Sequence, residues 1–154
     1  MPASYDFKRL IGWFKRVGGT VVALHTYETH GGGIEHLWDV PTLDVNLANT
    51  LTTSRRTDAV KVPLNFSVES RLNVVIKDAA SNGYGWICCP DQVDTAPSET
   101  AAPLCNVGNQ STTTAPSQLM IRTSATGTIA ARSLLATVDL YAVSTLGFTW
   151  ARRN

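Results

Sequence analysis

Hydrophobic residues in the second half of the chain come in short runs that are separated by polar and turn-forming residues. Runs bounded in this way by Gly, Pro, Asn and Ser are typical of β-strands that follow one another closely along a chain. The predicted strands are residues 60–68, 72–76, 84–89, 118–123, 128–132 and 136–143. The pattern therefore predicts an all-β fold, an antiparallel β-sandwich or a jelly-roll-like domain.

The first half of the chain continues the strand pattern on both sides of a glycine triplet. Residues 20–27 form a β-branched and aromatic run, and a second run covers residues 34–40 and then alternates with polar residues up to Leu47. Such alternation indicates half-buried strands. Residues 90–116 carry no pattern, and a loop of this length in a small domain is usually functional or packed against a partner.

An amphipathic, basic segment precedes these strands. Its apolar residues have the spacing of one face of a helix, and they are Phe7, Leu10, Ile11 and Phe14. Nearby glycines limit a helix to about three turns, and an extended conformation also fits. The segment either covers the domain's own core or docks as an anchor into a neighbouring protein. On the second interpretation, residues 1–50 are an N-terminal attachment segment with strands, and residues 51–154 are the β-sandwich that forms the oligomer.

The composition is that of one globular domain with little charge. The 154 residues are 44% hydrophobic and 16% charged, and the formal net charge is +1. This charge provides no large field to attract nucleic acid or an anionic membrane. The sequence contains neither an apolar run of about 18 residues nor the pattern of a signal peptide. We therefore expect synthesis in the cytoplasm, no membrane insertion and no nucleic-acid partner.

The sequence offers weak candidates for chemistry. The best metal candidates are the histidines and glutamates around the glycine triplet: His25, Glu28, His30, Glu35 and His36. Their spacing does not match that of a zinc hydrolase, so no metal site is expected. Motifs for a serine nucleophile or a nucleotide are absent from the sequence, and Asp91, Asp94 and Glu99 have the setting of solvated loop residues. We expect no catalytic residues, no cofactor and no enzymatic activity.

The three cysteines are Cys88, Cys89 and Cys105. A bridge from Cys88 or Cys89 to Cys105 would close a loop of roughly 17 residues and contribute about 3 kcal/mol of stability. The alternative is three reduced thiols, because cytosolic cysteines stay reduced. Both readings stay open at the level of the sequence.

The last hundred residues resemble a module of tailed-bacteriophage virion proteins. The resemblance is carried by the segments 72–80, 85–104, 118–133 and 141–153, including the loop sequence Pro-Asp-x-x-Asp-x-Ala-Pro-Ser over residues 90–98. It implies a β-sandwich, usually a homotrimer, in a fibre, spike, collar or capsid decoration, with other virion proteins as partners. It implies localisation in the virion and no catalytic residues. Residues 121–129 additionally suggest a β-hairpin with Gly127 near its turn.

The end of the chain suggests a subunit contact. Phe148 and Trp150 stand at alternate positions of a strand and are followed by Arg152 and Arg153, and aromatic and arginine side chains are enriched in interfaces. The alternative function is a carbohydrate-binding or host-receptor-binding module. It would recognise a host surface glycan through exposed aromatic rings, for which the candidates are Trp38, Tyr84, Trp86 and Trp150.

Overall fold

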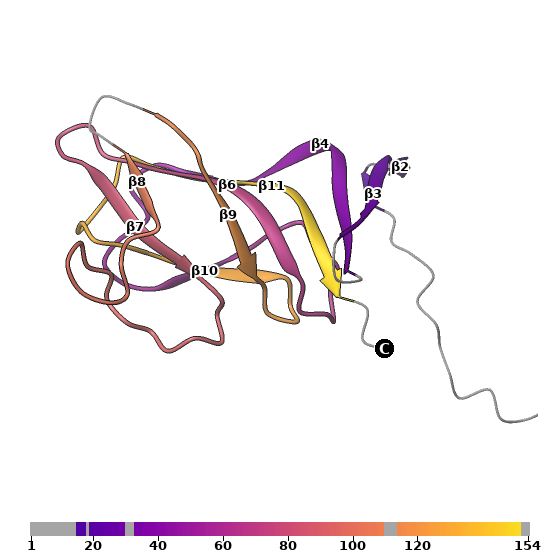
Figure 1. The fold of residues 1–154 in the computed structure, drawn as a ribbon. Helices are drawn as coiled ribbons and strands as arrows, with labels where there is room; N and C mark the ends of the chain where they lie inside the picture. Colours follow the sequence, from indigo (N-terminus) through magenta and orange to yellow (C-terminus); the bar gives the residue numbers. More distant parts are fainter. Residues whose placement is uncertain (1–14, 18, 30–32, 110–113, 152–154) are drawn as a thin grey trace, which may run out of the picture.

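The computed structural model describes residues 15–17, 19–29, 33–109 and 114–151. These residues contain strands and no helix, and two antiparallel sheets pack against each other as a β-sandwich (Figure 1). The strands are β1 (Lys15–Val17), β2 (Thr20–Val22), β3 (Leu24–Glu28), β4 (Gly33–Leu47), β5 (Arg56–Ala59), β6 (Glu69–Lys77), β7 (Gly83–Cys88), β8 (Val107–Asn109), β9 (Ser117–Arg122), β10 (Thr128–Ser133) and β11 (Leu140–Ala151). The predicted all-β fold is confirmed.

The order of the strands makes the sandwich a jelly roll. One sheet has the order β5-β10-β7-β8, and the other has the order β3-β4-β11-β6-β9. Among the eight strands β4 to β11, the first therefore pairs with the last, the second with the seventh, the third with the sixth and the fourth with the fifth. This is a long hairpin folded over itself, the arrangement that gives a jelly roll its two packed sheets.

Four of the predicted strands are confirmed, three of them to within one residue at each end, whereas the predicted residues 72–76 form only the central part of their strand. They correspond to β6, β7, β9 and β10. In β6 the side chains alternate strictly, because Leu72, Val74 and Ile76 are fully buried while the residues between them are half-buried. The last predicted strand, residues 136–143, begins too early, since β11 starts at Leu140 and continues to Ala151.

The strand predicted for residues 60–68 is wrong, because these residues form a loop. Its hydrophobic residues misled the prediction, since Val60 and Val68 are buried at the two ends of the loop and anchor it to the core. Between them, Pro63 has no N–H to donate to a ladder. Asn65 takes a left-handed conformation with φ of 69°.

The hairpin predicted over residues 121–129 is also wrong. β9 pairs with β6 in the five-stranded sheet, whereas β10 pairs with β5 and β7 in the other sheet. Gly127, with φ of 71°, does lie in a tight turn, and this turn carries the chain from one sheet to the other. A turn signal in the sequence does not show whether the flanking strands pair.

The long strand β4 joins the N-terminal part of the chain to the sandwich. It pairs with β11 at both ends, but the register jumps from Thr42–Thr145 to Leu37–Gly147, so that extra residues of β4 bulge out between them. A Cβ atom on Gly147 would lie 2.1 Å from the carbonyl oxygen of His36, so the close approach of the two strands requires glycine there. The expected boundary between the attachment segment and the sandwich, at residue 50, lies after the end of β4. Residues 33–47 of the expected attachment segment are part of the five-stranded sheet of the sandwich.

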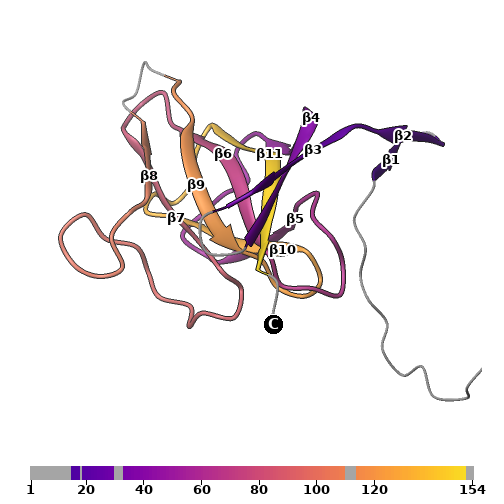
Figure 2. The same ribbon diagram turned by 45° about the vertical axis from the view of Figure 1, so that its right-hand side comes forward.

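The strands that precede β4 lie at the edge of the sandwich. β3 pairs with the first part of β4, and its side chains are mostly exposed. β1 and β2 form a separate small hairpin beyond that edge (Figure 2). The predicted attachment residues Phe7, Leu10, Ile11 and Phe14 lie outside the described residues.

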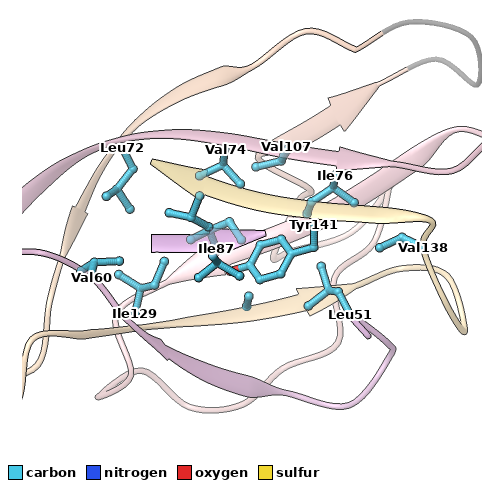
Figure 3. Packing of buried hydrophobic residues seen from close by; sticks show 13 residues of the cluster. Leu51, Val60, Leu72, Val74, Ile76, Ile87, Val107, Ile129, Val138 and Tyr141 are labelled. Atoms are coloured by element: carbon cyan, nitrogen blue, oxygen red, sulfur yellow. The ribbon is translucent and has the colours of Figure 1, made fainter. Parts of the chain in front are cut away.

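The main core fills the space between the two sheets, and Tyr141 of β11 lies in it with Ile87 and Leu51 beside its ring (Figure 3). The buried members of this cluster are Val45, Leu51, Val60, Leu72, Val74, Ile76, Ile87, Val107, Ile129, Ala131, Val138, Tyr141 and Val143. A smaller cluster of Trp38, Val68 and Phe148 packs at the end of the sandwich where β11 finishes. This second cluster supports the groove described below.

Candidate functional site

The predicted subunit-contact residues occupy different environments. Phe148 is fully buried, and its ring centroid lies 4.9 Å from that of His36 and 5.8 Å from that of Trp38. Its side chain is therefore a core residue of its own chain and offers no surface to a neighbour. Trp150 is half-buried and packs on the edge of the same cluster. Arg152 and Arg153 lie outside the described residues.

Trp150 lines a groove of about 650 Å³ at the end of the sandwich. Three parts of the chain meet there: the loop before β6 with the first residue of β6, the last residue of β9, and the end of β11. The lining residues, which we call the Trp150 groove, are Asn65, Phe66, Ser67, Val68, Glu69, Arg122, Thr149 and Trp150. Aromatic rings and charged groups thus share one concave surface.

The sheet register places the polar residues of the Trp150 groove side by side. Glu69 stands opposite Arg122 of β9 and opposite Thr149 of β11. Such directly opposed residues have Cβ atoms about 5 Å apart. Yet Glu69 and Arg122 form no ion pair with each other, and within the described part of the chain the Glu69 carboxylate accepts no hydrogen bond.

A chain of hydrogen bonds fixes the loop that forms one wall of this groove. The Arg122 Nε donates to Ser67 Oγ at 2.8 Å, and Ser67 Oγ donates to the carbonyl oxygen of Thr123 at 2.5 Å. The backbone N–H of Thr123 donates to Val68 at 2.9 Å. The loop is therefore held to the β9–β10 turn, and Phe66, which is 40% exposed, is presented at the rim.

The other aromatic candidates are placed differently. Trp38 is buried, and its Nε1 donates to the carbonyl oxygen of Lys61 at 3.1 Å. Trp86 lines a second hollow of about 510 Å³ with Cys89, Gln92 and Met120, and Tyr84 is half-buried on the same strand β7. Phe66 is the aromatic residue of the Trp150 groove that was not predicted from the sequence. The residues around position 66 in the sequence give no sign that Trp150 lines the same groove.

The three cysteines are free thiols in the structure, so the bridge considered from the sequence is not formed. Cys88 ends β7 with its side chain buried, and burial raises the pKa of its thiol. Cys89 donates weakly to the Asp91 carboxylate at 3.7 Å. Burial also raises the pKa of the Cys105 thiol, and the negative charge of Glu99 is the second cause of this increase. A raised thiol pKa disfavours the thiolate, the reactive form.

The metal candidates are not brought together. His25 donates to Asp39 at 3.1 Å, and Glu35 accepts from Arg71 at 2.7 Å. His36 is buried, and its Nδ1 shares a hydrogen bond of 3.2 Å with the Thr26 hydroxyl. In the described part of the chain, no group of three or more His, Cys, Asp or Glu residues could hold a metal ion. His30 lies outside that part.

We expect stability to fall as the pH drops below about 6.5 because of His36. Burial lowers the pKa of His36 from its ordinary value of 6.5. Above that value both the folded and the unfolded chain carry a neutral imidazole, so His36 contributes no pH dependence there. Below it the unfolded chain takes up the proton first, which favours unfolding until the lower folded-state pKa is reached.

Urea titrations between about pH 7 and pH 5, where histidine titrates, measure this effect. The His36→Gln variant keeps a group that can bond to Thr26 but cannot titrate, so its stability should change less over this range. Equal pH dependence in the parent and His36→Gln would contradict the assignment.

Comparisons with known proteins give no further identification: no family model, no curated protein and no solved structure matches the chain. The class of the protein is accordingly given by its fold, an eight-stranded jelly roll with an additional edge strand and an N-terminal hairpin. Among the described residues, no helix is long and apolar enough to cross a membrane.

Proposed function

We propose that the chain is a structural subunit of a virus particle and that it works by assembling with copies of itself and with other virion proteins. The observation that carries the proposal is the jelly-roll pairing of β4 with β11, β5 with β10, β6 with β9 and β7 with β8. Jelly rolls of eight strands form viral capsid domains as well as lectins and cupins. Because one fold serves several functions, the surface must supply the rest of the argument.

The sequence resemblance narrows the proposal to a tailed bacteriophage. It favours a homotrimer in a fibre, collar, spike or capsid decoration, and it covers residues from about 60 to the end of the chain. These residues supply β6 to β11, six of the eight strands of the jelly roll. The resembling module thus coincides with most of the sandwich.

The surface of the described chain exposes several large hydrophobic side chains, some singly and some close together along one strand. They are Val21, Tyr27, Val40, Leu43, Leu64, Phe66, Val93, Leu104 and Met120. Four of them belong to β2, β3 and β4, and Val40 and Leu43 are 64% and 57% exposed within one short stretch of β4. Neighbouring exposed apolar residues, unlike single scattered ones, are typical of contacts with other proteins, and Val40 and Leu43 are therefore the candidates for such a contact.

Assembly of the purified chain tests the proposal. We expect size-exclusion chromatography with light scattering to give a mass several times that of the 16.6 kDa chain at micromolar concentration. Electron microscopy of the same fraction distinguishes a trimer, as the phage resemblance predicts, from a closed shell. A single species of monomer mass, unchanged on concentration, would contradict self-assembly.

A pair of variants tests whether β4 contributes to the contact. Replacing Val40 and Leu43 together with aspartate should lower the measured mass toward that of the monomer, because two charges cannot be buried unpaired in an interface. The matched control is Val93→Asp, at an 86% exposed position on the long loop, which should assemble as the parent does. Circular dichroism verifies that both proteins are folded. Full assembly of the double variant would rule out this surface.

A further inference from the structure

We infer that the Trp150 groove binds a neutral saccharide, a function that goes beyond assembly. The groove combines two features that a sugar requires. Its apolar part consists of the Phe66 and Trp150 side chains, whose rings can stack against the C–H face of a pyranose. Its polar part consists of Glu69, Arg122, Asn65, Ser67 and Thr149, which can bond to hydroxyl groups.

The charges in the groove indicate that the ligand is neutral. Glu69 and Arg122 are its two ionisable residues, and they carry opposite charges. An acidic sugar would gain from Arg122 and lose to Glu69, whereas a hydroxyl group can donate to the carboxylate and accept from the guanidinium at once. Adjacent hydroxyls of a neutral sugar match this pair of neighbours on β6 and β9.

The polar groups that would contact the sugar have bonding capacity left. Of the Arg122 nitrogens, Nε is used by Ser67 Oγ, and its two Nη groups have no partner among the described residues. The Glu69 side chain likewise accepts nothing there. Charge-assisted hydrogen bonds from such groups are the stronger ones. Ligand binding would therefore add bonds without breaking those that hold the loop.

The groove is built in advance and has a suitable size. Trp150 packs on the buried cluster of Trp38, Val68 and Phe148, so its position is fixed by the core. The loop that carries Phe66 is tied down through Ser67 and Arg122. A preformed site loses less entropy on binding. The volume of about 650 Å³ falls within the range of small-molecule sites, about 300–1,000 Å³.

The test is binding of the labelled full chain to an array of neutral and sialylated oligosaccharides. We expect binding to neutral glycans without a preference for the sialylated ones. The strongest neutral oligosaccharide is then titrated in solution against the parent, Phe66→Ala and Glu69→Gln. Each substitution should weaken binding at least about tenfold, the effect of losing one well-placed contact.

Matched controls use residues of the same kind outside the groove. Leu104→Ala removes a large apolar side chain that is 55% exposed, and Glu99→Gln neutralises an exposed carboxylate on the long loop. Both should bind as the parent does. The inference is overturned if no neutral glycan binds, if sialylated glycans are preferred, or if the controls lose binding equally. Light scattering of the same proteins keeps the two proposals separate, since a parent chain that assembles but binds no neutral glycan overturns this inference alone.

Discussion

Replacing Phe148 with alanine is expected to lower the free energy of unfolding by about 3–5 kcal/mol. The side chain has no exposed surface and packs with the rings of His36 and Trp38 in the smaller core cluster. Removing the ring loses its transfer free energy and leaves a cavity, and both effects lower stability. The strands cannot move together to fill this cavity, because β11 already lies against β4 at Gly147. Urea unfolding followed by tryptophan fluorescence measures the change.

A matched control separates a core residue from a surface contact. Met120→Ala removes a hydrophobic side chain that is 47% exposed on β9, and its effect should stay within about 0.5 kcal/mol. Parent and variants are compared at one protein concentration, because assembly adds to apparent stability. If Phe148→Ala left stability unchanged and altered the assembled mass alone, Phe148 would be a subunit contact, as the sequence suggested, and its assignment to the core would fail.

Removing the Asp58 carboxylate is expected to cost about 3 kcal/mol of stability, the effect of breaking one side of a buried ion pair. Asp58 is 8% exposed and accepts three hydrogen-bond contacts from Arg56 two residues earlier on β5, at 2.5, 2.9 and 3.1 Å. The hydrogen bond to Asp58 is the main cause that raises the pKa of Arg56. In Asp58→Ala the guanidinium would keep its charge without a partner.

The position of this ion pair explains why its loss should be costly. The Arg56 guanidinium lies 5.7 Å from the centre of the Tyr141 ring, which is fully buried in the main core. Burial, followed by the charge of Asp58, raises the pKa of Tyr141, so the hydroxyl stays protonated. The ion pair therefore lies at the edge of the main core next to Tyr141, where water cannot fully solvate an unpaired cation.

The second ion pair on the four-stranded sheet provides the control. Arg132 donates to Asp94 at 2.9 Å, but the Asp94 side chain is 48% exposed. The Arg132 side chain is 22% exposed, so the two pairs differ in the exposure of the carboxylate and not of the arginine. Asp94→Ala should therefore cost less than Asp58→Ala, because water reaches the position of the Asp94 carboxylate and can take its place beside the guanidinium. Thermal or urea unfolding of both variants at neutral pH makes the comparison. Equal, small losses would show that the Arg56–Asp58 pair is effectively solvated.

The sequence predicted those features that depend on neighbours along the chain. The short, mostly hydrophobic run from Leu72 to Ile76 located the centre of β6, because such a run needs only its own residues and the polar residues that bound it to be recognised. The strand prediction for residues 60–68 failed because hydrophobic residues are buried in loops as well as in strands. Val60 and Val68 are both buried and so reach the core. A loop that is anchored at both ends can bury two such residues without forming a strand.

The candidate groove could not have been predicted in the same way. Trp150 was identified from the sequence as an aromatic residue of interest, but Phe66, which lines the same groove, lies 84 positions earlier, in a segment predicted to be a strand. Glu69 and Arg122 become neighbours only through the pairing of β6 with β9. The cysteines show the same limit, because their spacing along the chain allowed a bridge, whereas all three are free thiols in the structure.

The sequence by itself determined that this protein is built from strands and where many of its strands lie, because hydrophobic periodicity and turn residues act over a few neighbouring positions. The tertiary structure alone decided which strands pair, and so made a jelly roll out of an unordered set of strands. Pairing depends on contacts between residues far apart in the chain, such as those of β4 with β11. Phe148 is a core residue and Trp150 a groove residue for that reason, although the two differ by only two positions in one strand.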